Sequence, residues 1–263
     1  MTALEPIAVL GVPVLGGAPD AALAEIEAAA LERPPVTVGF ANAHTLNVAA
    51  TDAGYRELLE RFDFVLNDGA GVALAARMHG RRFAANLNGS DFTPRILERC
   101  AARGWSVFML GGLPGVAEEA AGNLWRDIAG LRIAGTRHGY FDSDEAEDVV
   151  AAIRASEADV LLVALGNPRQ ESWLEEHLVD TGARIGVAVG AFLDFAAGRV
   201  PRAPARLNRL GVEWLYRLVQ EPGRLWRRYI LGNPRFVARV AWERLMSAAR
   251  RTGRAARGRS SRG

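Results

Sequence analysis

Residues 159–171, DVLLVALGNPRQE, decide the fold. The six residues after Asp159 are all apolar, as in a strand that is buried on both faces of a parallel sheet. Gly166, Asn167 and Pro168 are typical of a loop, and a helical pattern follows over residues 169–180. The stretch therefore predicts a strand, a turn and a helix, with polar side chains placed where the strand ends.

The same order of strand and helix repeats from the N-terminus to about Gly198. This alternation predicts an α/β domain over residues 1–198, with a doubly wound, mostly parallel sheet and helices on both faces. The expected strands are 7–11, 36–41, 62–67, 105–111, 132–136, 159–165 and 184–189, and the expected helices are 20–32, 44–60, 70–79, 91–103, 114–129, 143–156, 169–180 and 191–197.

The charge of the chain is divided unevenly between its two parts. All 32 basic residues are Arg, and the net charge is only +2. Residues 1–198 hold 15 Arg against 27 acidic residues, whereas residues 199–263 hold 17 Arg against 3 Glu. Such asymmetry indicates that the two parts have different partners, and that the basic part contacts phosphate groups.

The basic part itself has two regions. Over residues 199–246, apolar residues recur at helical spacing, from Leu207, Leu210 and Trp214 onward, with breaks expected at Pro222 and Pro234. This pattern predicts an appendage of two or three short amphipathic helices. Residues 247–263 have almost no apolar side chains, which predicts a disordered basic tail.

Two partners suit this appendage. One is an anionic membrane surface, and the alternative is nucleic acid, bound by an Arg-rich tail on a nucleotide-binding domain. Trp, Leu, Tyr and Ile alternate with Arg at helical period here, which favours the membrane and argues against nucleic acid. Arg224, Arg227 and Arg228 share one helix face beside Trp226 and Tyr229, as expected of a helix at a membrane interface.

Composition also excludes several classes of protein. Cys100 is the only cysteine, so no intrachain disulfide can form and a reducing cytoplasm is expected. No signal peptide and no apolar stretch of about 18 residues is present. The four histidines lack metal-ligand spacing, and Asp142 with Glu145 reads better as a helix cap than as a metal motif, so no metal and no cofactor is expected.

Polar residues follow four of the expected strands, where the carboxyl ends of a parallel sheet form a ligand crevice. Asp68, in NDGAGV, is the candidate general base, and its alternative is an ordinary Asp-Gly turn or helix cap. GGLPG at 111–115 suits a diphosphate but is also a routine glycine turn. The candidate ligand contacts at this edge are Asn42, His44, Gly111, Gly112, Asn167, Arg169 and Gln170.

Several motifs together resemble a known family. The segments ANAHTLNVA, NDGAGV, NGSDF, GGLPG, GNPRQE, VGAFLDFAAG and EWLYRLVQEPGRLWRRY are similar, in order and spacing over about residues 7–245, to the bacterial WecG/TagA/CpsF glycosyltransferases. The resemblance implies inverting, metal-independent transfer of a hexose or N-acetylhexosamine from a UDP-sugar to an undecaprenyl-diphosphate-linked saccharide. It also implies peripheral attachment to the inner face of the plasma membrane, self-association, and a role in exopolysaccharide, capsule or teichoic-acid-like polymers.

Site residues follow from the same resemblance. It implies that Asp68 is the base and that Asn42 and Gln170 contact substrate. It also implies that three appendage arginines contact the diphosphate and the membrane: Arg217, Arg224 and Arg227. Asn86, Asn88 and Asp91 of NLNGSD are further substrate contacts. Asn86 stands where the N-acetylmannosaminyl members carry Arg, and Phe40 where they carry Thr, so the sequence is closer to the exopolysaccharide branch.

Overall fold

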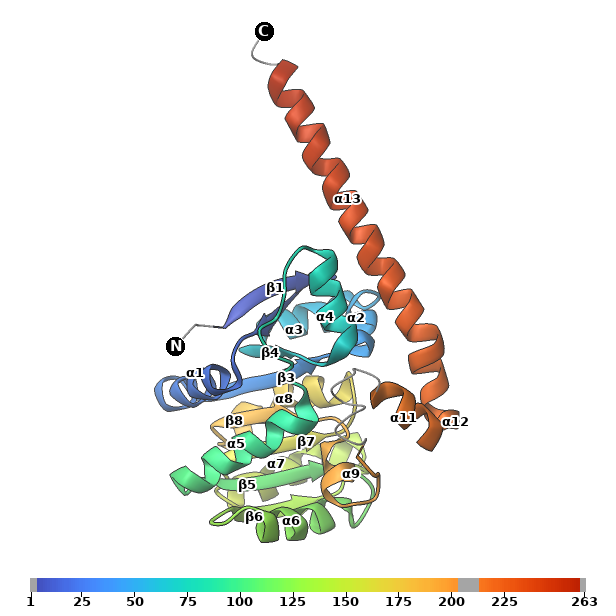
Figure 1. The fold of residues 1–263 in the computed structure, drawn as a ribbon. Coiled ribbons are helices and arrows are strands. Elements are labelled where there is room, and N and C mark those ends of the chain that lie inside the picture. Colours follow the sequence, from blue (N-terminus) through green and yellow to red (C-terminus); the bar gives the residue numbers. More distant parts are fainter. Residues whose placement is uncertain (1–3, 203–212, 261–263) are drawn as a thin grey trace.

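A single eight-stranded sheet forms the centre of the protein, in a computed structural model that describes residues 4–202 and 213–260 (Figure 1). The strand order is β1-β2-β4-β3-β8-β7-β5-β6. Only β1 and β2 pair antiparallel, so the expected mostly parallel α/β sheet is confirmed. The strands are β1 (Glu5–Val9), β2 (Val12–Gly16), β3 (Val36–Ala41), β4 (Phe64–Asn67), β5 (Ser106–Gly111), β6 (Arg132–Arg137), β7 (Val160–Ala164) and β8 (Ile185–Ala188).

Helices cover both faces of this sheet, as expected for a doubly wound fold. Buried side chains form two cores, one on each side: α2, α3, α4, α7 and α8 pack on one face, and α1, α5, α6 and α9 on the other. The helices are α1 (Pro19–Glu32), α2 (Ala43–Ala49), α3 (Ala53–Arg61), α4 (Gly69–Met78), α5 (Gly89–Arg103), α6 (Val116–Asp127), α7 (Ala146–Ala155), α8 (Arg169–Thr181) and α9 (Phe192–Ala196), with the 3-10 turn η1 (Ser143–Glu145) before α7.

The structure differs from the sequence prediction at two places in this domain. Strand β2 was not expected; it forms a hairpin with β1 through Leu10 and Gly11, whose positive φ angles of 51° and 86° suit a two-residue turn. The helix expected over 44–60 is instead two helices. The first ends at Ala49, and Asp52 caps the second, its carboxylate accepting a hydrogen bond from the Tyr55 N–H at 3.0 Å.

The basic appendage continues as helices α11 (Glu213–Gln220) and α12 (Pro222–Trp226), the π-helical segment η2 (Arg227–Leu231) and the long helix α13 (Gly232–Ser260). The expected break at Pro234 is wrong, because Pro234 lies in the first turn of α13, directly after the π-helical turns. The predicted Leu207 and Leu210 lie outside the described residues.

Helix α13 also extends beyond the point where the sequence predicted disorder. It continues as helix through residues 247–260, where Ala and Arg, both strong helix formers, dominate and no proline occurs. None of the helices in the described ranges is both long and apolar enough to cross a membrane.

The start of α13 lies against α2 and α4 of the α/β domain (Figure 1). Phe236 and Val240 are buried in the same core cluster as α2 and α4. The Asn47 side chain of α2 donates to the Gly232 carbonyl at 2.8 Å and accepts from Arg239 at 2.7 Å. Through these contacts the appendage is fixed over the carboxyl ends of β3 and β4.

Candidate active site

Asn42 and Asp68 lie side by side because β3 and β4 are neighbours that end together. Ala41 pairs with Asn67 in the register of the two strands, and the Asp68 N–H donates to the Ala41 carbonyl at 2.9 Å. The Asn42 amide then donates to the Asp68 carboxylate at 3.3 Å. Two residues that are 26 positions apart in the sequence thus form one polar pair at the sheet edge.

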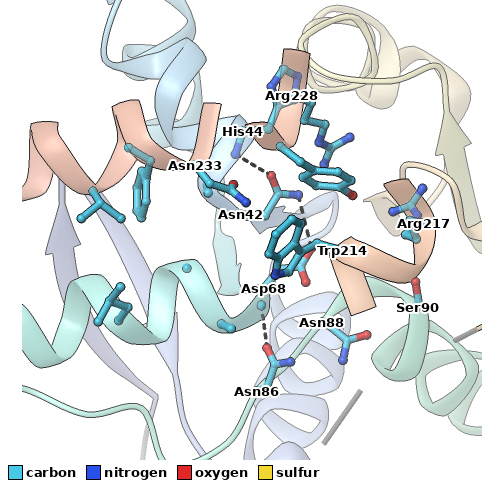
Figure 2. Close-up of a pocket in the computed structure, with 18 residues that line it drawn as sticks. Asn42, His44, Asp68, Asn86, Asn88, Ser90, Trp214, Arg217, Arg228 and Asn233 are labelled. Carbon is cyan, nitrogen blue, oxygen red and sulfur yellow. Dashed lines mark hydrogen bonds between the residues drawn. The ribbon is translucent and has the colours of Figure 1, made fainter. Parts of the chain in front are cut away.

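The orientation of the Asn42 amide is fixed by its second task as the cap of α2. Its oxygen accepts from the backbone N–H group of His44 at 3.0 Å (Figure 2) and from that of Thr45 at 3.1 Å. Because the oxygen is occupied in this way, the amide can present only N–H groups to Asp68. The cap therefore ensures that Asn42 stabilises an ionised Asp68.

The segment after α4 brings two more asparagines to the same place. Asn67 donates to the Ala85 carbonyl at 2.9 Å, and the Gly69 N–H donates to Asn86 Oδ1 at 2.8 Å. Asn88 caps α5 by accepting from the Asp91 N–H at 2.9 Å. These bonds place Asn86 and Asn88 below Asp68 in the view of Figure 2.

A cavity of about 350 Å³ opens above Asp68. Its floor comes from the α/β domain and its roof from the appendage, with Trp214 and Tyr229 in ring contact at 5.9 Å between centroids. One side is therefore polar and the other aromatic and cationic. The lining residues are Asn42, Ala43, His44, Asp68, Gly69, Ala70, Gly71, Leu74, Asn86, Asn88, Ser90, Trp214, Arg217, Arg228, Tyr229, Asn233, Phe236 and Val237.

A second, smaller cavity of about 70 Å³ extends from the same carboxylate along the ends of β3, β8 and β7. It adds Asn167, Gln170 and Gly190 to the site, while Asp68 and Arg217 line both cavities. Asp68 thus lies at the junction of the two spaces. Ser90, Asn42 and Arg228 are the other residues that both cavities share.

Burial and nearby charges act in opposite directions on Asp68. Burial raises the pKa of the carboxyl above its ordinary value, whereas the Asn42 hydrogen bond and the guanidinium groups of Arg228 and Arg217 lower it. The net effect is a raised pKa. A carboxylate with a raised pKa is a better proton acceptor than an exposed one, which is the property that a general base needs.

His44 is electrically neutral in this site. Burial, together with the positive charge of Arg228, lowers its pKa from 6.5 to about 4. We predict that the imidazole carries no proton charge from about pH 5.5 to 8. Titration of the His44 ring by NMR checks this, with its resonances expected to stay constant over that range. A midpoint near pH 6.5 would show that the ring is not in the environment described.

Gln170 is held by a buried carboxylate. Its Nε2 donates to Glu171 Oε1 at 2.8 Å, and its Oε1 accepts from the Gly190 N–H at 3.1 Å. The Asn167 amide donates to the same Glu171 oxygen at 2.5 Å. Glu171 is only 1% exposed, and burial raises its pKa. The amides of Asn167 and Gln170 therefore have fixed directions at the edge of the smaller cavity.

We predict that Glu171→Ala lowers the free energy of unfolding by about 2–4 kcal/mol, because both amides lose a buried acceptor and a cavity forms. Urea denaturation measures this change. The matched control on the same helix is Glu175→Ala, which removes only an exposed ion pair with Arg61 and is expected to cost less than about 1 kcal/mol. Equal effects of the two variants would contradict the role given to Glu171.

The structure brings together eight of the residues singled out in the sequence. These eight line one or both cavities: Asn42, His44, Asp68, Asn86, Asn88, Asn167, Gln170 and Arg217.

Five others lie elsewhere. Arg169 turns away onto the Phe141 ring, 5.2 Å from its centroid, and Gly111 and Gly112 line neither cavity. Asp91 contacts Asn88 and Arg202 instead of either cavity, and Arg227 lines a separate groove. Phosphate binding at Gly111 and Gly112 stays a prediction, and the side chain of Arg224 lies outside the described residues.

Four further residues belong to the roof: Trp214, Arg228, Tyr229 and Asn233. The sequence pattern includes the first three, but it does not show that they line the site, and Asn233 has no signal in the motifs. Arg228 and Arg217 are the arginines near Asp68, whereas Arg227 lines the separate groove only. The π-helical geometry of η2 explains this, because its wider turn shifts the side chains relative to an α-helix. Within the described ranges, no group of three or more His, Cys, Asp or Glu side chains could hold a metal ion.

Comparison with known proteins matches most of the chain to one family of glycosyltransferases. Residues 7–250 match the Glycosyl transferase WecG/TagA/CpsF family, a range that includes both cavities and the docked part of the appendage. A similar protein is the N-acetylglucosaminyldiphosphoundecaprenol N-acetyl-beta-D-mannosaminyltransferase of Bacillus spizizenii. It is 34% identical over 187 residues, which is 71% of this chain and 71% of the relative. The chain therefore belongs to the WecG/TagA/CpsF family of glycosyltransferases.

Proposed function

We propose that this glycosyltransferase moves a hexose or N-acetylhexosamine from a UDP-sugar to a polyprenyl-diphosphate-linked saccharide, with inversion and without a metal. The observation that carries the proposal is the position of Asp68 at the junction of two cavities, below Arg217 and Arg228. The name of the Bacillus spizizenii relative supports the lipid-linked acceptor. The product belongs to a cell-surface polysaccharide, such as exopolysaccharide, capsule or a teichoic-acid-like polymer.

Asp68 acts as the general base in this proposal. Its carboxylate accepts the proton of the acceptor hydroxyl as that oxygen attacks the anomeric carbon. The bond between this carbon and the UDP oxygen breaks on the opposite face, through an oxocarbenium-like transition state, and the configuration inverts. Asn42 keeps the base ionised before the attack, since its amide presents only donors.

The departing UDP needs positive charge, and the appendage supplies it. Arg217 reaches both cavities and lies 5.1 Å from the centroid of the Phe195 ring on α9. Arg228 also faces both cavities. Guanidinium groups hydrogen-bond phosphate oxygens in a fixed geometry and so stabilise the charge that develops on the leaving group. Arg224 remains a candidate for the diphosphate of the acceptor, whereas Arg227 lines a groove outside both cavities.

We place one end of the donor in the smaller cavity, since its volume of about 70 Å³ holds only part of a UDP-sugar, and the acceptor saccharide in the larger one. Ligands of doubly wound sheets bind beyond the carboxyl ends of the central strands, which is where Asn167, Gln170 and Gly190 lie. The larger cavity has the aromatic roof of Trp214 and Tyr229, a surface that suits the apolar face of a sugar ring.

A panel of UDP-sugars tests the proposal. Full-length protein is incubated with each donor and a lipid-linked acceptor, and UDP release and thermal stabilisation are measured. We expect one donor to stabilise the protein and to support UDP release. Phe40 lines the smaller cavity and Asn86 lines the larger one, and both cavities border on Asp68. They stand in place of the Thr and Arg of the N-acetylmannosaminyl members, so a donor other than UDP-N-acetylmannosamine is expected. Failure of every UDP-sugar to bind would refute the proposal.

We also propose that the protein works at the inner face of the plasma membrane, held there by the appendage. Trp226, Ile230, Trp242 and Leu245 expose between 42% and 65% of their surface. Apolar side chains interleaved with arginine suit a lipid interface, where each Arg contributes about 1 kcal/mol on an anionic surface.

A further inference from the structure

A second concave surface lies on the other side of η2 from the active-site cavity. This groove, of about 590 Å³, is formed by the end of α12, by η2 and the start of α13, and by α2 with the residues that follow it. His44 and Arg228 separate it from the cavity, because they line both. The lining residues are His44, Asn47, Val48, Thr51, Leu225, Arg227, Arg228, Gly232, Arg235 and Arg239.

The groove is strongly cationic. Four of its ten lining residues are Arg, and none of the ten is Asp or Glu. Arg239 is held in place by its Nη1, which donates to the Asn47 carbonyl at 2.9 Å and to Asn47 Oδ1 at 2.7 Å. The other N–H groups of this guanidinium are not used in those bonds. Asn47 and Thr51 add neutral polar groups from α2.

Apolar side chains are exposed in the same part of the appendage. Trp226, Ile230 and Leu231 expose 42%, 51% and 39% of their surface, and Arg227 lies 5.3 Å from the centroid of the Trp226 ring. Segment 226–231 therefore combines arginines that line the groove with side chains that suit the boundary of a lipid layer.

We propose that this groove binds the phosphate of an anionic lipid headgroup, while Trp226 and Ile230 enter the interface beside it. Guanidinium groups bind phosphate oxygens in pairs of charge-assisted hydrogen bonds, and four of them in one concavity match a phosphodiester better than a zwitterionic headgroup. The site is separate from the two cavities that hold the substrates. The inference rests on the proposed membrane location. It adds that the junction of α2 and α13 takes part in binding the membrane.

The test places a negative charge on the wall that does not belong to the appendage. Thr51 is exposed and lies at the end of α2, so Thr51→Asp adds a carboxylate to the groove and leaves every Arg in place. Binding of the full chain is measured by flotation with vesicles of phosphatidylcholine containing phosphatidylglycerol. We expect about tenfold weaker binding for Thr51→Asp. The matched control Ala28→Asp, exposed on α1, makes the same change in net charge and is expected to change binding less than about twofold.

A second variant and a soluble competitor complete the experiment. Arg235→Gln removes an exposed lining arginine and is expected to weaken vesicle binding, unlike Arg82→Gln, which removes an exposed arginine outside the groove. The protein is expected to bind phosphatidylglycerol vesicles, and glycerol phosphate is expected to displace it from them only at high concentration. This result supports a headgroup site. Parent-like binding of both groove variants would overturn it, as would thermal stabilisation by inorganic phosphate without vesicle binding.

The failure of this inference is distinct from failure of the proposed function. The vesicles contain no donor and no acceptor, so the result does not depend on sugar transfer. Absence of binding between the parent protein and phosphatidylglycerol vesicles would contradict both the membrane location and the groove. Parent protein that binds them, with both variants unchanged, would contradict the groove alone.

Discussion

Replacing Asp68 by Asn is expected to lower kcat for sugar transfer by about 10²–10⁴-fold, the range that a general base contributes. The variant keeps the shape of the side chain, and its oxygen still accepts from the Asn42 amide, but it cannot take a proton from the acceptor hydroxyl. Because burial raises the pKa of Asp68, the ionised carboxylate costs folding free energy at neutral pH, and the neutral amide is not expected to destabilise the protein.

Product formation from a UDP-sugar and a lipid-linked acceptor measures this loss, and thermal stabilisation by UDP shows whether the donor still binds. Asp91→Asn is the matched control: Asp91 is close enough to raise the pKa of Asp68 but lines neither cavity. A small effect is expected there. Near-normal turnover of Asp68→Asn would remove Asp68 from the role of base.

Phe236→Ala is the second substitution with a large expected effect, because it acts on the docking of the appendage. Phe236 is 1% exposed and belongs to the core of the α/β domain, although it comes from α13. Loss of a buried Phe side chain costs about 3–5 kcal/mol. Here that cost falls on the contact between α13 and the domain, so the roof over Asp68 separates and takes Arg217 and Arg228 with it.

We expect kcat/KM of Phe236→Ala to fall by about 10²–10³-fold, since 1.4 kcal/mol corresponds to a factor of ten. Tryptophan fluorescence is expected to change as well, because Trp214 loses its place in the cavity. Trp242→Ala, at a 65% exposed position of the same helix, serves as the control with kcat/KM near that of the parent on a detergent-dispersed acceptor. Unchanged kcat/KM of Phe236→Ala would show that the docked roof is not needed for transfer.

The floor of the site could be predicted from the sequence because it depends on the sheet. In a parallel sheet the residues after each strand share one edge, so Asn42, Asp68 and Gln170 could be placed together without knowledge of side-chain contacts. At Gly111 the same rule does not separate a ligand contact from a packing requirement. The φ of 141° at Gly111 and an added Cβ only 2.4 Å from the Ala164 carbonyl oxygen show that packing against β7 requires glycine there, with or without a ligand.

The arrangement of the roof could not be predicted, for two physical reasons. Helical periodicity assumes α-helix throughout and puts Arg227 and Arg228 on one face, but the π-helical turns decide that Arg228, and not Arg227, lines the active-site cavity. The position of α13 depends on contacts between segments far apart in the chain, such as the bond from Arg239 to Asn47 across 192 positions. Amphipathic spacing shows that Phe236 and Val240 share a face, but it does not show which surface covers them.

The pH dependence of kcat, compared between the parent protein and Arg228→Gln, tests most directly the claim that Asp68 is the base beneath an arginine roof. Activity requires the ionised carboxylate, so kcat falls as the pH drops through the pKa of Asp68, which burial raises above the ordinary value for Asp. Arg228 lowers that pKa, and its removal is therefore predicted to move the acidic limb of the profile to higher pH. An acidic limb at the same pH in both proteins, or at lower pH in the variant, would contradict the account.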